Sequence, residues 1–426
     1  MNTIITLLFI VGYAAIAFEH SLKINKTASA LLTGVLCWVV YIMASGNTDL
    51  VSEQLYEHFG QISGILFFLL AAMTIVELID AHDGFKVITD KITTKDTRKL
   101  LWIISFVTFF LSSVLDNLTT TIVMVSLLRK LITDKEIRMF FIGMVVIAAN
   151  AGGAWTPIGD VTTTMLWIGG QITTGNIMIE LFVPSLLCIV VPLILLSFRI
   201  KGKIENAPII ENQQIDPTSS FERKLILGLG IGALIFVPVF KTVTGLPPFL
   251  GILFGLGVLW VVTEIIHKKK NNADKDVYSV VHALRKVDVP SVLFFLGILV
   301  AISALESTHL LANLAAYMDR TIGNINVIVI SIGLLSAIID NVPLVAATMG
   351  MYDMQTYPTD HYFWEFIAYC AGTGGSCLII GSAAGVAAMG MEKIDFFWYV
   401  KKISLLALLG YFAGAFAYIA QHALFH

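Results

Sequence analysis

The chain has 426 residues, of which 57% are hydrophobic and only 13% are charged, and its mean hydropathy is +0.84. A soluble fold of this length could not bury so much apolar surface, so the composition excludes a soluble globular protein and predicts an all-α polytopic membrane protein. The net charge of −3 gives no support for a nucleic-acid partner, and the four cysteines stand singly in apolar sequence, without the spacing of a zinc site or a disulfide framework.

Ten apolar windows of about 20 residues are expected to cross the membrane. They lie at 3–18, 27–44, 61–79, 139–168, 178–198, 224–240, 248–266, 291–305, 362–391 and 396–420. The first window resembles a signal peptide, because Ala15-Ile16-Ala17 imitates a cleavage site, but no Lys or Arg precedes it. A first membrane helix is therefore the favoured interpretation.

Two further apolar stretches, 100–128 and 325–351, are interrupted by the same dipeptide, Asp116-Asn117 in one and Asp340-Asn341 in the other. Each half of a stretch is short for a crossing, so each stretch is predicted to form a re-entrant hairpin. A carboxylate at membrane depth costs about 2.5 to 3.5 kcal/mol on insertion scales, which indicates a functional site. Helix capping is the alternative, although Ser or Thr would cap without adding a charge.

Loop charge orients the two hairpins. Both flanks of 100–128 are rich in Lys and Arg, whereas the flanks of 325–351 carry only Arg320. Since positive loops stay in the cytoplasm, the first hairpin is expected to open to the cytoplasm and the second to the outside. The same rule, applied to ten crossings, places both the N- and the C-terminus outside.

The two halves of the chain, 1–199 and 223–426, can be aligned with each other, with the polar segment 200–222 as a linker. Matching positions are separated by 229, 224 and 222 residues, respectively, in the pairs Glu77 and Glu306, Asp116 and Asp340, and Gly153 and Gly375. Because each half has five crossings, an odd number, the second half would insert upside down. The pattern predicts an inverted-topology repeat of five spans plus one re-entrant hairpin each, with its site at the midplane.

Glycine and proline interrupt the matching windows 139–168 and 362–391. The interrupting residues are Gly152, Gly153 and Pro157 in the first window and Gly372, Gly374, Gly375 and Gly381 in the second. These residues break helical hydrogen bonding, so both windows are predicted to be broken helices with unwound backbone at the midplane. The alternative is close helix packing on small residues.

The predicted centre is rich in oxygen ligands and has no Lys or Arg. The candidate ligands for cation and proton are Asp116, Asn117, Thr119, Thr120, Asn150, Thr156, Asp160, Asp340, Asn341 and Thr373. Oxygen ligands without a basic partner suit a hard cation, and Asp116 and Asp340 are the expected Na⁺ ligands. A carboxylate that holds either a cation or a proton makes the two compete, which is the basis of antiport.

Two further acidic residues, Glu77 and Glu306, stand near span ends. They are expected either to lie on a proton path or to face the membrane interface. The sequence leaves both alternatives open.

Four motifs resemble the NhaD-type Na⁺/H⁺ antiporters of the ion transporter superfamily. They are LDNLTTT at 115–121, NAGGAWTPIGDVTTTMLW at 150–167, IDNVPL at 339–344 and GTGGSCLIIGSAAGVAAMG at 372–390. The resemblance implies a homodimer in the bacterial inner membrane whose hairpins and broken helices move as an elevator-type transport domain. It also implies Na⁺ or Li⁺ and H⁺ as the transported ions, and no cofactor.

Two other functions compete with antiport. A Na⁺-coupled carrier of a carboxylate or another anion would share the same superfamily. An intramembrane aspartyl protease would use two membrane aspartates, but it needs a GxGD motif, and Pro157 stands where its first glycine belongs. The chain is therefore predicted to be a transporter and not an enzyme.

Overall fold

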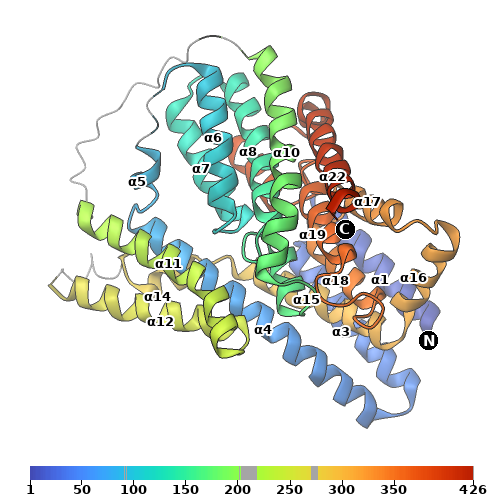
Figure 1. Ribbon diagram of the computed structural model, residues 1–426. Coiled ribbons are helices and arrows are strands. Elements are labelled where there is room, and N and C mark those ends of the chain that lie inside the picture. Colours follow the sequence, from blue (N-terminus) through green and yellow to red (C-terminus); the bar gives the residue numbers. More distant parts are fainter. Residues whose placement is uncertain (91, 93, 201, 203–217, 270–276, 426) are drawn as a thin grey trace.

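The computed structural model describes residues 1–90, 92, 94–200, 202, 218–269 and 277–425, and these residues form helices and connecting turns without a β-strand (Figure 1). The helices of the first part are α1 (Asn2–Ala17), α2 (Glu19–Leu22), α3 (Lys26–Ser45), α4 (Thr48–Ala81), α5 (Lys86–Thr89), α6 (Thr97–Ser112), α7 (Asn117–Leu131), α8 (Lys135–Ala154), α9 (Val161–Ile168) and α10 (Thr174–Arg199). Those of the second part are α11 (Ser220–Thr244), α12 (Pro248–Ile266), η1 (His267–Lys269), α14 (Val280–Lys286), α15 (Val289–Ser307), α16 (Leu310–Thr321), α17 (Ile325–Leu335), α18 (Asn341–Met351), α19 (Tyr362–Gly374), α20 (Ala383–Glu392), α21 (Phe396–Tyr399), η2 (Val400–Ser404) and α22 (Leu405–Phe425). The predicted all-α class is confirmed for these residues, whereas most of the predicted linker 200–222 lies outside them.

Eight of the described helical segments are long and apolar enough to cross a membrane. They are α3, α4, α8, α10, α11, α12, α15 and the continuous segment Phe396–Phe425. Helices α1, α17 and α18 are apolar but shorter. The predicted polytopic membrane protein is therefore confirmed, and the predicted windows 139–168 and 362–391 each consist of two shorter helices, α8 with α9 and α19 with α20.

Two segments that were expected to be loops are helical instead. Helix α4 has 34 residues and begins at Thr48, well before the predicted window 61–79. Its first turns are too polar for a hydropathy window to detect, but Asn47 caps them by accepting a hydrogen bond from the Leu50 amide. Helix α16 lies between the predicted window 291–305 and the predicted hairpin 325–351, where a loop was expected.

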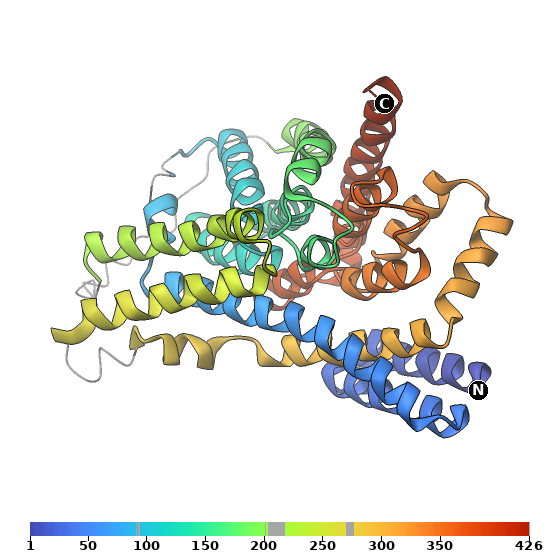
Figure 2. The ribbon, with the colours of Figure 1, turned by 60° about the horizontal axis from the view of Figure 1, so that its bottom comes forward.

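The helices form two layers, which Figure 2 shows one above the other. In one layer α3 packs on α1 and α15, α4 packs on α12 and α15, and α11 packs on α12. In the other layer α10 packs on α22, α6 on α8, α17 on α19, and α7 on α20. The layers meet where α18 packs on α15 and α16 and where α9 contacts α4. The turns that carry the two Asp-Asn pairs lie near this boundary.

Glycines let two pairs of helices touch through their backbones. A Cβ atom at Gly152 of α8 would collide with the carbonyl oxygen of Phe109 in α6, and one at Gly374 of α19 would collide with the carbonyl oxygen of Gly333 in α17. Only glycine fits at such a backbone contact. The helices before each Asp-Asn pair are thereby held tightly against the helices that precede the breaks.

The predicted breaks exist, and Pro157, Gly375 and Gly381 lie in them, whereas the other predicted glycines do not. Gly152 and Gly153 are helical within α8, and the unwound segment is 155–160. Gly372 and Gly374 are likewise helical within α19, and the second unwound segment begins at Gly375. For these helical glycines the alternative of close packing is the correct one.

A buried ion cluster joins the two parts of the chain at the end of α20. The Glu392 side chain is only 2% exposed, and it accepts from Nε of Arg129 in α7 at 3.1 Å and from Nε of Arg138 in α8 at 2.8 Å. The guanidinium groups also donate to the carbonyl oxygens of Met391 and Ile132, each at 2.7 Å. A buried carboxylate with this many donors is fully satisfied.

Replacing Glu392 with Gln should destabilise the protein strongly, because it leaves the largely buried Arg138 guanidinium without a counter-charge. Removing one member of a buried ion pair costs about 3 to 5 kcal/mol. Thermal unfolding of the detergent-solubilised protein, followed by tryptophan fluorescence, should show a clearly lower midpoint for Glu392→Gln. The same change at the exposed Glu136 should leave the midpoint close to wild type, and equal midpoints for both variants would contradict the prediction.

Candidate functional site

The four helices that follow the two Asp-Asn turns and the two unwound segments, α7, α18, α9 and α20, each begin with a capping side chain, and three of these caps are aspartates. The capping hydrogen bonds run from Thr119 N to Asp116 Oδ1 at 2.8 Å, from Thr162 N to Asp160 Oδ1 at 2.9 Å, from Val342 N to Asp340 Oδ1 at 3.2 Å, and from Gly385 N to Ser382 Oγ at 3.2 Å. The first backbone N–H groups of a helix have no partner inside the helix, and the helix dipole favours negative charge there. Each aspartate is therefore stabilised as an anion by the helix that it starts.

Amide side chains connect these helix starts into one buried network. Asn117 Nδ2 donates to Asp160 Oδ2 at 2.6 Å and to Asn150 Oδ1 at 3.0 Å. Asn150 Nδ2 donates onward to Ser382 Oγ at 3.0 Å, and Asn341 Nδ2 lies 3.4 Å from Asp160 Oδ2. Asp160, which is 2% exposed, is the centre of this network.

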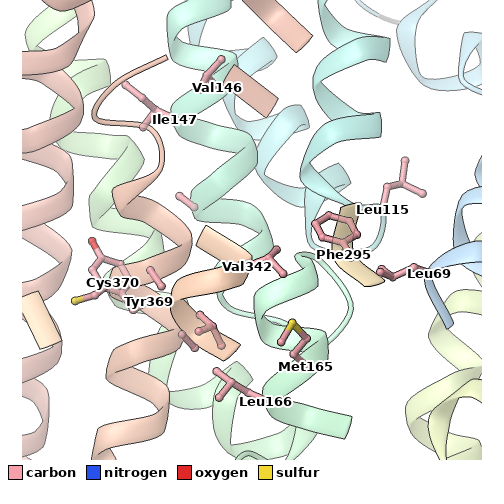
Figure 3. Packing of buried hydrophobic residues seen from close by; sticks show 14 of the residues in the cluster. Leu69, Leu115, Val146, Ile147, Met165, Leu166, Phe295, Val342, Tyr369 and Cys370 are labelled. Carbon is pink, nitrogen blue, oxygen red and sulfur yellow. The ribbon is translucent and has the colours of Figure 1, made fainter. Parts of the chain in front are cut away.

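A cavity of about 60 Å³ opens beside the network. Its polar lining includes Asp116, Asn117, Asp160 and Asp340, together with Lys26. Most of the other lining residues are apolar, and Figure 3 shows three of them close together: Leu115 from the α6–α7 turn, Leu69 from α4 and Phe295 from α15. A space of this size has room for a partly dehydrated ion or a few water molecules.

Lys26 was not anticipated at the centre. Its Nζ atom lies 3.7 Å from Asp340 Oδ2 and 4.5 Å from the centre of the Phe294 ring. The expectation that no basic residue reaches the site is therefore wrong. Lys26 directly precedes the apolar window 27–44 and so falls outside the predicted crossing, but Asn25 caps α3 and makes Lys26 its first residue.

The predicted threonines take different places. Thr119 Oγ1 donates to Asp116 Oδ2 at 2.6 Å, and Thr156 Oγ1 donates to the carbonyl oxygen of Ser113 at 2.6 Å, which ties the α6–α7 turn to the first unwound segment. The Thr120 hydroxyl is buried without a hydrogen-bond partner among the described residues. Thr373 does not line the cavity, since its hydroxyl donates to the carbonyl oxygen of Tyr369 in its own helix.

Glu77 and Glu306 are the two acidic residues that were considered for a proton path. Glu77 is partly buried near the end of α4, and Glu306 is exposed near the end of α15. Neither lines the cavity. A place on a proton path stays a prediction for both.

The polar lining of the cavity has more acid than base. It holds three carboxylates and one ammonium group. Among the described residues no three His, Cys, Asp or Glu side chains are grouped closely enough to hold a metal ion by themselves. An ion in this cavity would therefore be coordinated by a mixture of carboxylate, amide and hydroxyl oxygens.

Comparison with known proteins places the chain in a family. A family model described as citrate transporter matches residues 13–364. The chain belongs to the citrate transporter family. This citrate transporter family member is 55% identical to sodium/proton antiporter 1 of Arabidopsis thaliana over 98% of this chain and 72% of that protein, and 52% identical to sodium/proton antiporter 2 over 98% and 99%. It is 31% identical to the Na⁺/H⁺ antiporter NhaD of Vibrio parahaemolyticus over 90% of this chain and 97% of that protein.

Family membership confirms two predictions. The resemblance to NhaD-type antiporters holds over nearly the whole chain, and the protein is a transporter rather than an enzyme. Relatives that match most of this chain occur in a plant as well as in a bacterium. Location in a bacterial inner membrane therefore stays a prediction for this citrate transporter family member.

Replacing Asn117 with Ala should destabilise the protein, because Asp160 Oδ2 and Asn150 Oδ1 would both lose their shortest donor inside a buried network. Leaving Asn150 Oδ1 without a partner costs about 1 to 3 kcal/mol, and Asp160 Oδ2 would keep only the 3.4 Å contact with Asn341. The thermal midpoint of Asn117→Ala should fall well below that of Asn313→Ala, which alters an exposed amide on α16. Indistinguishable midpoints would show that the network does not hold the helix starts together.

Proposed function

We propose that the protein is a secondary active antiporter that exchanges Na⁺, or Li⁺, for H⁺. The observation that carries the proposal is the grouping of Asp116, Asp160 and Asp340 around one small, largely enclosed cavity with a single lysine. Repulsion among three carboxylates makes an anionic substrate unfavourable and a hard cation favourable. The relatives that are named sodium/proton antiporters support this assignment.

In this proposal the carboxylates hold either Na⁺ or protons, and the two compete. Asp116 and Asp340 reach the cavity from helices of opposite halves, and Asp160 accepts from Asn117 and Asn341, the residues that follow them in the chain. Thr119 and Asn117 orient the carboxylates by donating to Asp116 and Asp160. After Na⁺ leaves the cavity on one side of the membrane, protons bind the carboxylates. The protonated site then becomes accessible from the other side.

We further propose that 1–199 and 223–426 form an inverted-topology repeat, with re-entrant hairpins at 100–128 and 325–351. Contacts that recur at the expected separation support it. Ser112 Oγ donates to the Ala149 carbonyl oxygen at 2.6 Å, and Ser336 Oγ donates to the Ala371 carbonyl oxygen at 2.8 Å, 224 and 222 residues later. Both termini would then lie outside.

The two layers suggest how access alternates. The layer of α1, α3, α4, α11, α12 and α15 would stay fixed at a homodimer contact, and the layer that carries both unwound segments would move as an elevator. Lys241 of α11 donates to the carbonyl oxygen of Trp167 in α9 at 2.8 Å, so this contact between the layers would break during movement. A homodimer and a moving layer are parts of the proposal.

Antiport and the roles of the three aspartates can be tested together. In proteoliposomes with an imposed pH gradient, addition of Na⁺ to wild type should collapse the gradient. Asp116→Asn, Asp160→Asn and Asp340→Asn should each lower the initial rate at least about tenfold, although asparagine still caps the helices. Asp49→Asn, which alters an exposed carboxylate, should behave as wild type. If all three site variants match Asp49→Asn, the site assignment fails.

Competition between Na⁺ and protons for one site also determines how the apparent Na⁺ affinity depends on pH. Where protons occupy the carboxylates, the Na⁺ concentration for half-maximal rate should fall about tenfold for each unit rise in pH, because one proton must leave for each competing cation. Na⁺ titrations of the transport rate at several pH values would measure this slope. A half-saturating concentration that is independent of pH, with only the maximal rate changing, would contradict competition.

A Na⁺-coupled carrier of a carboxylate is the second candidate. The family description and the lysine in the cavity favour it, because an ammonium group can bind a carboxylate. Uptake of labelled citrate or succinate into proteoliposomes, stimulated by Na⁺, would support this function. Na⁺-dependent collapse of the pH gradient without such uptake would exclude it.

A further inference from the structure

A second cavity lies directly beside the ion cavity. Its volume is about 120 Å³, and its lining includes Tyr13 of α1 and Glu19 of α2. Lys26, Phe294 and Asp340 line both cavities. These three residues therefore lie between the ion cavity and its neighbour.

The ion pair between Lys26 and Asp340 also joins the two layers. Lys26 begins α3, and its backbone amide donates to Glu19 Oε1 at 3.2 Å, so the lysine is anchored in the layer of α1, α3 and α15. Asp340 begins α18, which follows the second predicted hairpin turn. The side chains are 28% and 17% exposed, so the pair is only partly hydrated.

We propose that Lys26 is a tethered counter-cation of the ion site, which neutralises Asp340 while the cavity holds no sodium ion and is displaced when Na⁺ binds. The inference rests on the proposed function and adds a residue to it. A lysine suits this part because its ammonium group is a compact charge on a flexible four-carbon chain. The second cavity offers the displaced ammonium group a new partner, the Glu19 carboxylate.

The charges around the Lys26–Asp340 ion pair determine how the loss of Lys26 would change the affinity of the cavity for cations. Asp116 and Asp160 face the pair from the ion cavity, and Glu19 and Tyr13 face it from the second cavity. The residues that α15 contributes to the two linings, Ser291, Phe294 and Phe295, are uncharged. Without the lysine the cavity keeps an additional uncompensated negative charge, so it should bind both Na⁺ and protons more tightly. The positive charge of Lys26 thus weakens cation binding enough for release.

The test replaces Lys26 with Met, with Gln, and with Arg. At a fixed alkaline pH, Lys26→Met should lower the Na⁺ concentration for half-maximal antiport several-fold, and the pH of half-maximal activity should rise by about 1 unit, as expected for removal of a charge within 4 to 6 Å. Lys26→Arg, which keeps the charge, should shift both quantities less than Lys26→Met does. Lys26→Gln removes the charge but keeps a hydrogen-bond donor toward Asp340. This variant provides the same test if Lys26→Met fails to fold.

Lys23→Met is the matched control, because it removes an exposed charge from the same connection between α1 and α3. Stabilisation of the detergent-solubilised protein by NaCl, compared with choline chloride, measures Na⁺ binding without transport. Uncharged Lys26 variants that match Lys23→Met in Na⁺ dependence and pH profile would overturn the inference while antiport stands. Absence of both Na⁺-dependent stabilisation and antiport in wild type would instead reject the proposed function.

Discussion

The site depends on helix starts that are buried in an apolar interior. Each such start has backbone N–H groups that no carbonyl oxygen of its own helix can satisfy, and at three of the four starts an aspartate accepts from them. The electrostatic effect of the helix lowers the cost of keeping each carboxylate charged at depth. Capping and ion binding, which the sequence presents as alternatives, are thus compatible, since one carboxylate oxygen can cap while the other faces the network or the cavity.

The helix starts are positioned by backbone contacts rather than by large side chains. Gly152 and Gly374 admit a neighbouring carbonyl oxygen, and Ser112 and Ser336 fix the same neighbours by hydrogen bonds. Contacts of this kind tolerate no intervening side chain, so they hold α6 close against α8 and α17 close against α19. A site made of such rigid parts can select an ion by size and charge.

The hydropathy pattern and the free-energy cost of a carboxylate in the membrane predicted much of this structure. They did not predict contacts between residues that are distant in the sequence. Apolar windows located most helices, and the expense of a membrane carboxylate singled out Asp116 and Asp340, which do line the cavity. The first turns of α4 were missed because their polar residues dilute the hydropathy. The approach of Lys26 to Asp340 was missed because it joins residues more than 300 positions apart, and no local pattern encodes such a contact.

The cluster at Glu392 has a consequence for the order in which the chain assembles. Arg138 and Glu392 are 254 residues apart, and the arginine emerges from the ribosome long before its partner. Until α20 is synthesised and inserted, the guanidinium groups of α7 and α8 lack their counter-charge, so the N-terminal helices complete their packing late. Truncated chains that end before residue 392 are accordingly expected to be targets for membrane quality control, however complete their own helices are.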